Sequence, residues 1–196
     1  NSYVETWYSV SLAEGQNLQS QNGDKLLMTE TTKEDLAGNV NVIADSFEHN
    51  VPYELNGIKL LYASFTPPTA SKETASNPLI IWLHGAGEGG TDTTINTMGN
   101  KVVNLATEEI QSLFGETGAY ILAPQTPTMW MDYDGKATYN NTVPNSGGAS
   151  YYTEALMGLI ETYVSSHPEI DPNRIYIGGC SNGGYMTVNM IFTYPK

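Results

Sequence analysis

The chain predicts an α/β fold in which a mostly parallel sheet is built with crossover helices. Residues 78–83 form a continuous apolar run, PLIIWL, as expected of a parallel strand that is buried on both faces. Residues 151–164 place apolar side chains at helical spacing. Strand-like and helix-like segments alternate from residue 78 onward, which is typical of a parallel sheet with crossover connections.

Residues 1–51 are predicted to form a short β-rich N-terminal extension. Small apolar clusters, such as those at 7–10 and 40–43, are separated by turn-forming residues. The α/β domain would then cover residues 52–196. Its first strand is expected at 58–65, where apolar and polar residues alternate as in an edge or antiparallel strand.

The remaining elements follow from local patterns. A first helix is predicted over residues 101–113 and a second over 151–164, with Ser150 as its N-cap. Residues 171–174 read DPNR, a turn signal, and precede a short buried strand at 175–178. A further helix is predicted over 183–191.

Residues 179–183 read GCSNG and directly follow this predicted strand. A G-x-S-x-G pattern between a strand and a helix is typical of a nucleophile elbow, in which a strained turn exposes the serine. Small neighbours let such a turn form. Ser181 is therefore a candidate nucleophile. A glycine-rich turn with an incidental serine stays an alternative for this segment taken alone.

A second glycine-rich segment, HGAGEGG at residues 84–90, follows the predicted strand 78–83. In acyl transfer, backbone N–H groups stabilise the negative charge that develops on the carbonyl oxygen. The expected donors are the N–H groups of Ala86 and Asn182, the residue after the serine. His84 is expected to bond within the loop rather than to act as a base. Neither phosphate-binding glycine signature is present, which argues against a nucleotide site.

Three blocks, at residues 83–92, 120–125 and 173–185, together resemble α/β-hydrolase carboxylesterases. The similarity is to esterases related to polyhydroxybutyrate depolymerases and to the catalytic domains of prolyl oligopeptidases. It implies an α/β-hydrolase core with Ser181 as nucleophile and with no metal or other cofactor. It also implies a triad Asp and His after further strands, beyond Lys196.

These C-terminal strands are therefore expected to be missing from this chain. A second polypeptide that carries the C-terminal part of the same fold, or the remainder of the gene product, would supply them. His49 and His167 precede Ser181, against the chain order of this fold. Catalysis by one of them stays an alternative, because triads occur in other orders.

Residues 124–148 show little regular pattern, and long irregular loops are often functional. The resemblance places this loop near the active site. Trp130 is a candidate substrate-binding residue that would form an apolar wall for the acyl or alcohol group. Its alternative role is to anchor the loop to the core.

Composition and net charge limit the classes of partner and the environment that the chain is expected to have. A net charge of −13, from 21 acidic and 8 basic residues, argues against nucleic acid, which needs clustered Lys and Arg. No run of about 18 apolar residues is present, so no membrane span is expected. One cysteine excludes an internal disulfide framework. A secreted, extracellular or cell-surface enzyme is the expectation.

The sequence thus favours a serine carboxylesterase that acts on a small-molecule or polymer ester. Two alternatives remain. One is a serine peptidase of the prolyl oligopeptidase type, and the other is an inactive hydrolase scaffold that serves as a binding module.

Overall fold

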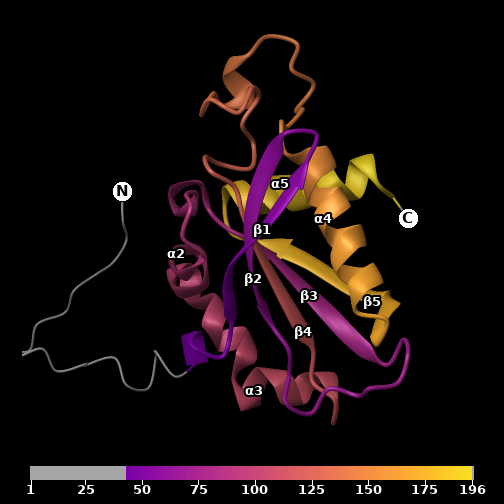
Figure 1. Cartoon of the computed structure of the whole chain (residues 1–196). Coiled ribbons are helices and arrows are strands. Elements are labelled where there is room, and N and C mark those ends of the chain that lie inside the picture. Colours follow the sequence, from indigo (N-terminus) through magenta and orange to yellow (C-terminus); the bar gives the residue numbers. More distant parts are fainter. Residues whose placement is uncertain (1–42, 196) are drawn as a thin grey trace, which may run out of the picture.

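The computed structural model describes residues 43–195, so most of the predicted β-rich extension lies outside the described residues. Five strands form one sheet in the order β1-β2-β4-β3-β5 (Figure 1). They are β1 (Glu48–Leu55), β2 (Ile58–Phe65), β3 (Asn77–Leu83), β4 (Tyr120–Gln125) and β5 (Ile170–Gly179).

The sheet has a parallel half and an antiparallel half. Strands β4, β3 and β5 run parallel, whereas β2 is antiparallel to both β1 and β4. The α/β fold class is confirmed. The strand predicted at 58–65 is β2, an interior antiparallel strand rather than an edge. The predicted division at residue 52 cuts through β1, so the sheet already begins at Glu48.

Helices cover both faces of the sheet (Figure 1). One face carries α2 (Thr93–Met98), η2 (Gly99–Ala106), α3 (Glu108–Gln111) and η3 (Ser112–Phe114), and the other carries α4 (Thr153–Ser166) and α5 (Asn182–Thr193). Along β4, Tyr120 and Leu122 pack in the cluster that contains α4, while Ile121 and Ala123 pack in the cluster that contains η2. Successive side chains of a strand point to opposite faces of the sheet, so β4 contributes to the hydrophobic core on each face.

The predicted helix at 101–113 is wrong as a single element. The segment breaks into η2, α3 and η3, because Thr107 is extended at φ −70° and ψ 150°. At its start, Asn100 and Lys101 have φ of 48° and 55°, outside the right-handed helix. Non-glycine residues rarely take such positive φ values.

The two other helix predictions are confirmed as α4 and α5, with shifted ends. Ser150 is not the N-cap of α4, a position that Tyr152 occupies. The Ser150 hydroxyl accepts instead from the Tyr152 N–H, at 3.1 Å, just before the helix. The predicted 171–174 turn lies inside β5, where Asp171 Oδ1 accepts from Asn173 N–H at 2.9 Å and the pairing with β3 is irregular.

Strands β3, β4 and β5 end at the same edge of the sheet, because they are parallel. The segments that follow them are the 84–92 loop with η1 (Ala86–Glu88), the 126–152 loop with η4 (Asn140–Thr142), and the turn at 180–181. Figure 1 shows the 126–152 loop rising above this edge. Among residues 43–195, no helix is long and apolar enough to cross a membrane.

Candidate active site

Ser181 lies in the turn between β5 and α5, and its side chain is exposed. Its backbone has φ 50° and ψ −110°. Non-glycine residues keep such a sparsely populated conformation only where the surrounding structure imposes it. Here Cys180 N–H donates to Leu83 O at 3.0 Å, and Gly183 N–H donates to Cys180 O at 2.7 Å. The turn is thereby fastened to the end of β3.

Packing explains both glycines of the GCSNG motif. A Cβ on Gly179 would lie 2.6 Å from Leu83 O, and one on Gly183 would lie 2.1 Å from the same oxygen. Both distances are far below van der Waals contact, so no side chain fits at either position. By contrast, a Cβ on Gly184 would lie 3.4 Å from its nearest neighbour. Glycine is therefore required at both positions because the turn packs closely against β3.

The 84–92 loop is held from within by His84, which is only 1% exposed. Its Nδ1 lies 2.7 Å from Gly85 O, and its Nε2 accepts from the Thr126 N–H at 3.1 Å. Because a carbonyl oxygen can only accept, Nδ1 carries the proton. Burial lowers the pKa of His84 to about 4, which keeps the ring neutral at pH 7. Nδ1 therefore bonds within the loop, as expected, whereas Nε2 ties the loop to Thr126 at the end of β4.

The Ala86 and Asn182 N–H groups, the two expected oxyanion donors, have no acceptor among the described residues. The two segments that carry them are neighbours, since a Cβ on Gly85 would lie 3.9 Å from Cys180 O. The Asn182 side chain is used differently. Its Oδ1 accepts from Met131 N–H at 3.0 Å and so ties the 126–152 loop to the serine turn.

Trp130 is fully buried. Its ring centroid lies 5.1 Å from that of His84 and 6.5 Å from that of Tyr152, the latter in an edge-to-face arrangement. This position fits the anchoring role, and the substrate-binding role of Trp130 stays a prediction. Trp130 fastens the 126–152 loop over the His84 ring.

Asp132 organises the same loop. Its carboxylate accepts four backbone N–H groups, from Asp134, Gly135, Ala137 and Thr138, and the Thr128 hydroxyl at 2.6 Å. Burial alone would raise the pKa of this carboxyl, but the hydrogen bonds outweigh burial and hold the pKa below its usual value. These hydrogen bonds give the loop a defined conformation although it has little regular secondary structure.

The sequence analysis missed the polar residues that clamp the 84–92 loop to β4. Gln125 Nε2 donates to Glu88 O and to Asp92 O, both at 2.9 Å, and Gly90 N–H donates to Thr126 O at 2.8 Å. The sequence does carry a signal for these residues, because the apolar run of β4 changes to polar residues at Gln125 and Thr126.

The two remaining histidines are engaged elsewhere. His49 contacts Thr93 Oγ1 at 3.1 Å and Ala44 O at 2.9 Å through its two ring nitrogens. His167 donates to Tyr163 O at 2.8 Å and precedes β5, a ten-residue strand whose far end leads to Ser181. Within residues 43–195, no hydrogen bond joins Ser181 to a histidine, and no group of three His, Cys, Asp or Glu could hold a metal ion.

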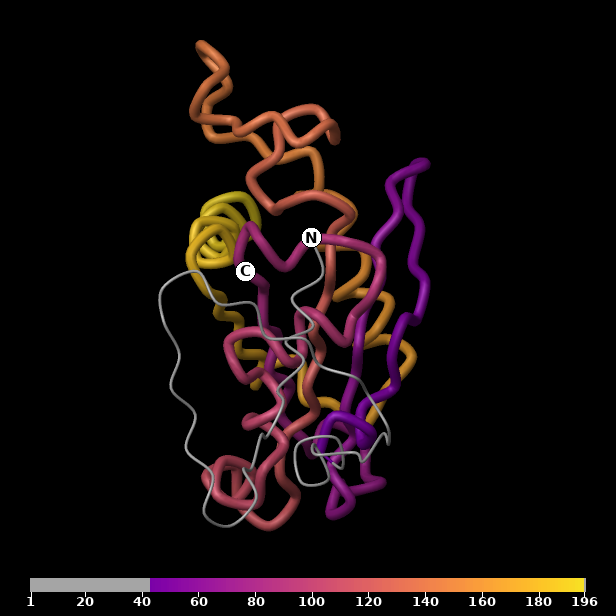
Figure 2. The backbone as a smooth tube through the Cα atoms, turned by 90° about the vertical axis from the view of Figure 1, so that its left-hand side faces the viewer, coloured from indigo at the N-terminus to yellow at the C-terminus, as the bar shows by residue number. Residues whose placement is uncertain are grey.

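Strand β5 is an edge of the sheet, and α5 beside it presents an outward apolar surface. We call this surface the α5 apolar face; its residues are Tyr185 (72% exposed), Val188 (51%), Ile191 (54%) and Phe192 (83%). Tyr176 of β5 is 51% exposed as well. Figure 2 shows α5 and the β1–β2 hairpin at opposite sides of the molecule.

The comparisons with known proteins agree with this geometry. The family model described as Phospholipase/Carboxylesterase matches residues 66–196. The chain belongs to this family. A probable carboxylesterase of Oryza sativa subsp. japonica is 23% identical over an alignment of 144 residues, with coverage of 66% of this chain and 48% of that protein.

Solved structures show the same fold. The crystal structure of a thermostable esterase superposes with a TM-score of 0.66 at 29% identity, over 79% of this chain and 39% of that one. An acetyl xylan esterase from Aspergillus awamori gives a TM-score of 0.51 at 16% identity, over 76% of this chain and 48% of that one. The α/β-hydrolase prediction is confirmed. The chain spans about half, or less, of the length of these relatives.

Proposed function

We propose that this chain carries the nucleophile of a serine carboxylesterase and that the nucleophile is Ser181. The observation that carries the proposal is the backbone of Ser181, at φ 50° and ψ −110°, held between two glycines that admit no side chain. Such strain costs on the order of 1–3 kcal/mol and clusters at functional sites. An exposed serine in a turn without a function would not require such a strained backbone.

In the proposed reaction, Ser181 Oγ attacks the ester carbonyl and passes its proton to a histidine base. The tetrahedral oxyanion accepts hydrogen bonds from the unused N–H groups of Ala86 and Asn182. Collapse expels the alcohol, which takes the proton from the histidine, and leaves an acyl group on Ser181. Water then attacks this acyl-enzyme with the same base and releases the carboxylic acid.

The base and its aspartate would come from a polypeptide segment outside this chain, one that carries the C-terminal part of the same fold. Two observations support this part of the proposal. The three histidines of the chain are engaged in other contacts. Within residues 43–195, the outer edge of β5 has no partner strand and lies beside the exposed side chains of the α5 apolar face. A strand and a helix added there would bury that surface and pair that edge.

Kinetics of the protein as purified test the proposal. We expect p-nitrophenyl acetate to be hydrolysed and S181A to lower kcat by about 10³-fold or more, as loss of a triad nucleophile does. The matched control is S165A, which removes an exposed α4 hydroxyl that donates to Thr162 O. Preference for a peptide substrate would favour the peptidase alternative. Absence of turnover on esters and peptides, in a protein that also contains the proposed C-terminal segment, would favour the binding module.

Mass spectrometry under native and then denaturing conditions tests the second segment. We expect a further polypeptide to leave the chain only on denaturation, or the chain to be joined to that segment. A hydrolytically active protein with the mass of 196 residues alone would contradict this part and return His49 and His167 to consideration.

A further inference from the structure

We propose that Glu88 is a positioning residue that holds the Gly85–Ala86 peptide in place as an oxyanion donor. The inference rests on the proposed function. Glu88 is only 8% exposed, and buried carboxylates are rare unless they are paired or hydrogen-bonded. Among the described residues no Lys or Arg pairs with it. Its burial therefore has to be explained by its hydrogen bonds.

Both hydrogen bonds of the carboxylate reach Oε2. Gly85 N–H donates to it at 2.7 Å and Asn100 Nδ2 donates to it at 2.8 Å. The other oxygen, Oε1, is buried with no partner among the described residues. Glu88 thus links the start of the 84–92 loop to the start of η2.

The structure around Glu88 is shaped to admit this carboxylate. A Cβ on Gly99 would lie 1.8 Å from Glu88 Oε1 and 2.8 Å from its Cδ. Gly99 has φ −61° and ψ 143°, a conformation open to any residue. A glycine is therefore needed at 99 to leave room for the Glu88 side chain, not to satisfy the backbone.

Planarity of the peptide bond connects Glu88 to the Ala86 N–H. Gly85 O and Ala86 N–H belong to one trans peptide unit and point in opposite directions. Gly85 O accepts from the Glu88 N–H at 3.1 Å and lies 2.7 Å from His84 Nδ1. The Glu88 carboxylate holds the N–H on the other side of Gly85. The carboxylate thus fixes the preceding His84–Gly85 peptide unit, while the Glu88 backbone N–H fixes the Gly85–Ala86 unit. Together the two bonds set both dihedral angles of Gly85 and hence the direction of the Ala86 N–H.

Four variants test the inference: E88A, E88Q, G99A and the E88A/G99A pair. In E88A we expect the Gly85 amide to exchange with deuterium about tenfold faster or more, as loss of a charge-assisted hydrogen bond predicts. We expect kcat on p-nitrophenyl acetate to fall about 10²-fold, because one oxyanion donor is misaligned. KM should stay within about threefold, because the oxyanion donor acts on the transition state and contributes little to binding of the substrate in its ground state.

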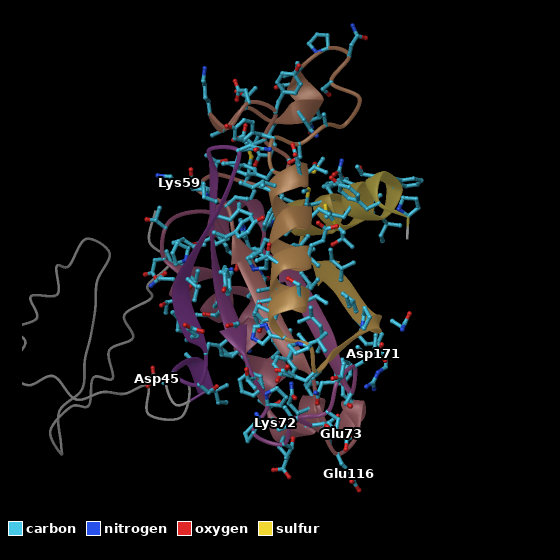
Figure 3. All side chains as sticks on the ribbon, turned by 45° about the vertical axis from the view of Figure 1, so that its right-hand side comes forward. Asp45, Lys59, Lys72, Glu73, Glu116 and Asp171 are labelled. Carbon is cyan, nitrogen blue, oxygen red and sulfur yellow. The ribbon has the colours of Figure 1, made fainter. Side chains whose placement is uncertain are left out.

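The other variants separate positioning from general damage. E88Q keeps an oxygen acceptor for the Gly85 N–H and should restore kcat to within about fivefold of the parent. G99A should reproduce the E88A defects by displacing the carboxylate, and the pair should be no worse than E88A alone, because both changes remove one interaction. The control is E116A, an equal loss of charge at the end of the molecule opposite the 126–152 loop (Figure 3).

Wild-type exchange at Gly85 together with wild-type kcat in both E88A and G99A would overturn the inference. A loss of kcat in E88Q as large as that in E88A would also overturn it. Such a result would mean that the negative charge of Glu88 matters for catalysis and not its hydrogen bond to the Gly85 N–H. Failure of the parent protein to hydrolyse esters, with the proposed C-terminal segment present, would instead contradict the proposed function. In that case Gly85 exchange in E88A and G99A decides the positioning claim alone.

Discussion

The contact between the 84–92 loop and the serine turn differs sharply from the outer side of β5 and α5. At the contact, a single added methyl group would collide with β3 backbone atoms. On the α5 apolar face, side chains of the same chain are 51–83% exposed. The backbone of the serine turn is therefore fixed by packing inside this chain. The surface beside it is where we propose that a further segment packs.

The largest effect is expected where the packing is tightest. In G183A the new Cβ would lie 2.1 Å from Leu83 O, and we expect a loss of about 3 kcal/mol in the free energy of unfolding, with loss of activity. Urea denaturation measures the former. G184A is the control, because its Cβ has ordinary contacts and alanine favours a helix over glycine by about 1 kcal/mol. Equal stability of the two variants would show that the contact is looser than described.

An acid-dependent effect comes next. The pKa of His84 is about 4 in the folded protein against 6.5 in an unfolded chain, so the unfolded state binds the additional proton between these values. Stability should therefore fall as pH drops from 6.5 to 4, by up to about 3 kcal/mol. H84N removes this group and should unfold with a flatter pH dependence, although it is less stable at pH 7. An unchanged pH dependence in H84N would contradict the neutral, buried assignment.

The smallest effect on stability is expected on the α5 apolar face. F192S changes a side chain that is 83% exposed, so the free energy of unfolding of the chain should change by less than about 0.5 kcal/mol. Association with the proposed C-terminal segment should weaken, as seen in the fraction of complex that survives native mass spectrometry. L113S is the matched control, an apolar residue that is 76% exposed and lies outside the face. Equal loss of complex in both variants would remove the face from the interface.

Local patterns were sufficient for much of the fold. The apolar run at 78–83 became β3 and the helical spacing at 151–164 became α4, since burial on one or both faces leaves a direct trace in the sequence. The helix predicted at 101–113 failed because Asn100, Lys101 and Thr107 leave the helical region. Asparagine is enriched at positive φ and threonine is a favoured N-cap residue, so the segment carried a weak signal that its helical spacing concealed.

For the candidate site, the sequence located the two glycine-rich segments but not what holds them. The contacts of Glu88 with Asn100, and of Gln125 with the 84–92 loop, join residues far apart in the chain. Such contacts exist only once the fold has formed. The same holds for Trp130, whose complete burial follows from the 126–152 loop folding back over His84.

The central claim, that Ser181 is a nucleophile, is tested most directly by a fluorophosphonate label on the natively purified protein, followed by intact mass and peptide mapping. The account predicts one label per chain, on Ser181, and none in S181A. A protein that hydrolyses esters yet carries the label on another residue, or carries none, would contradict it.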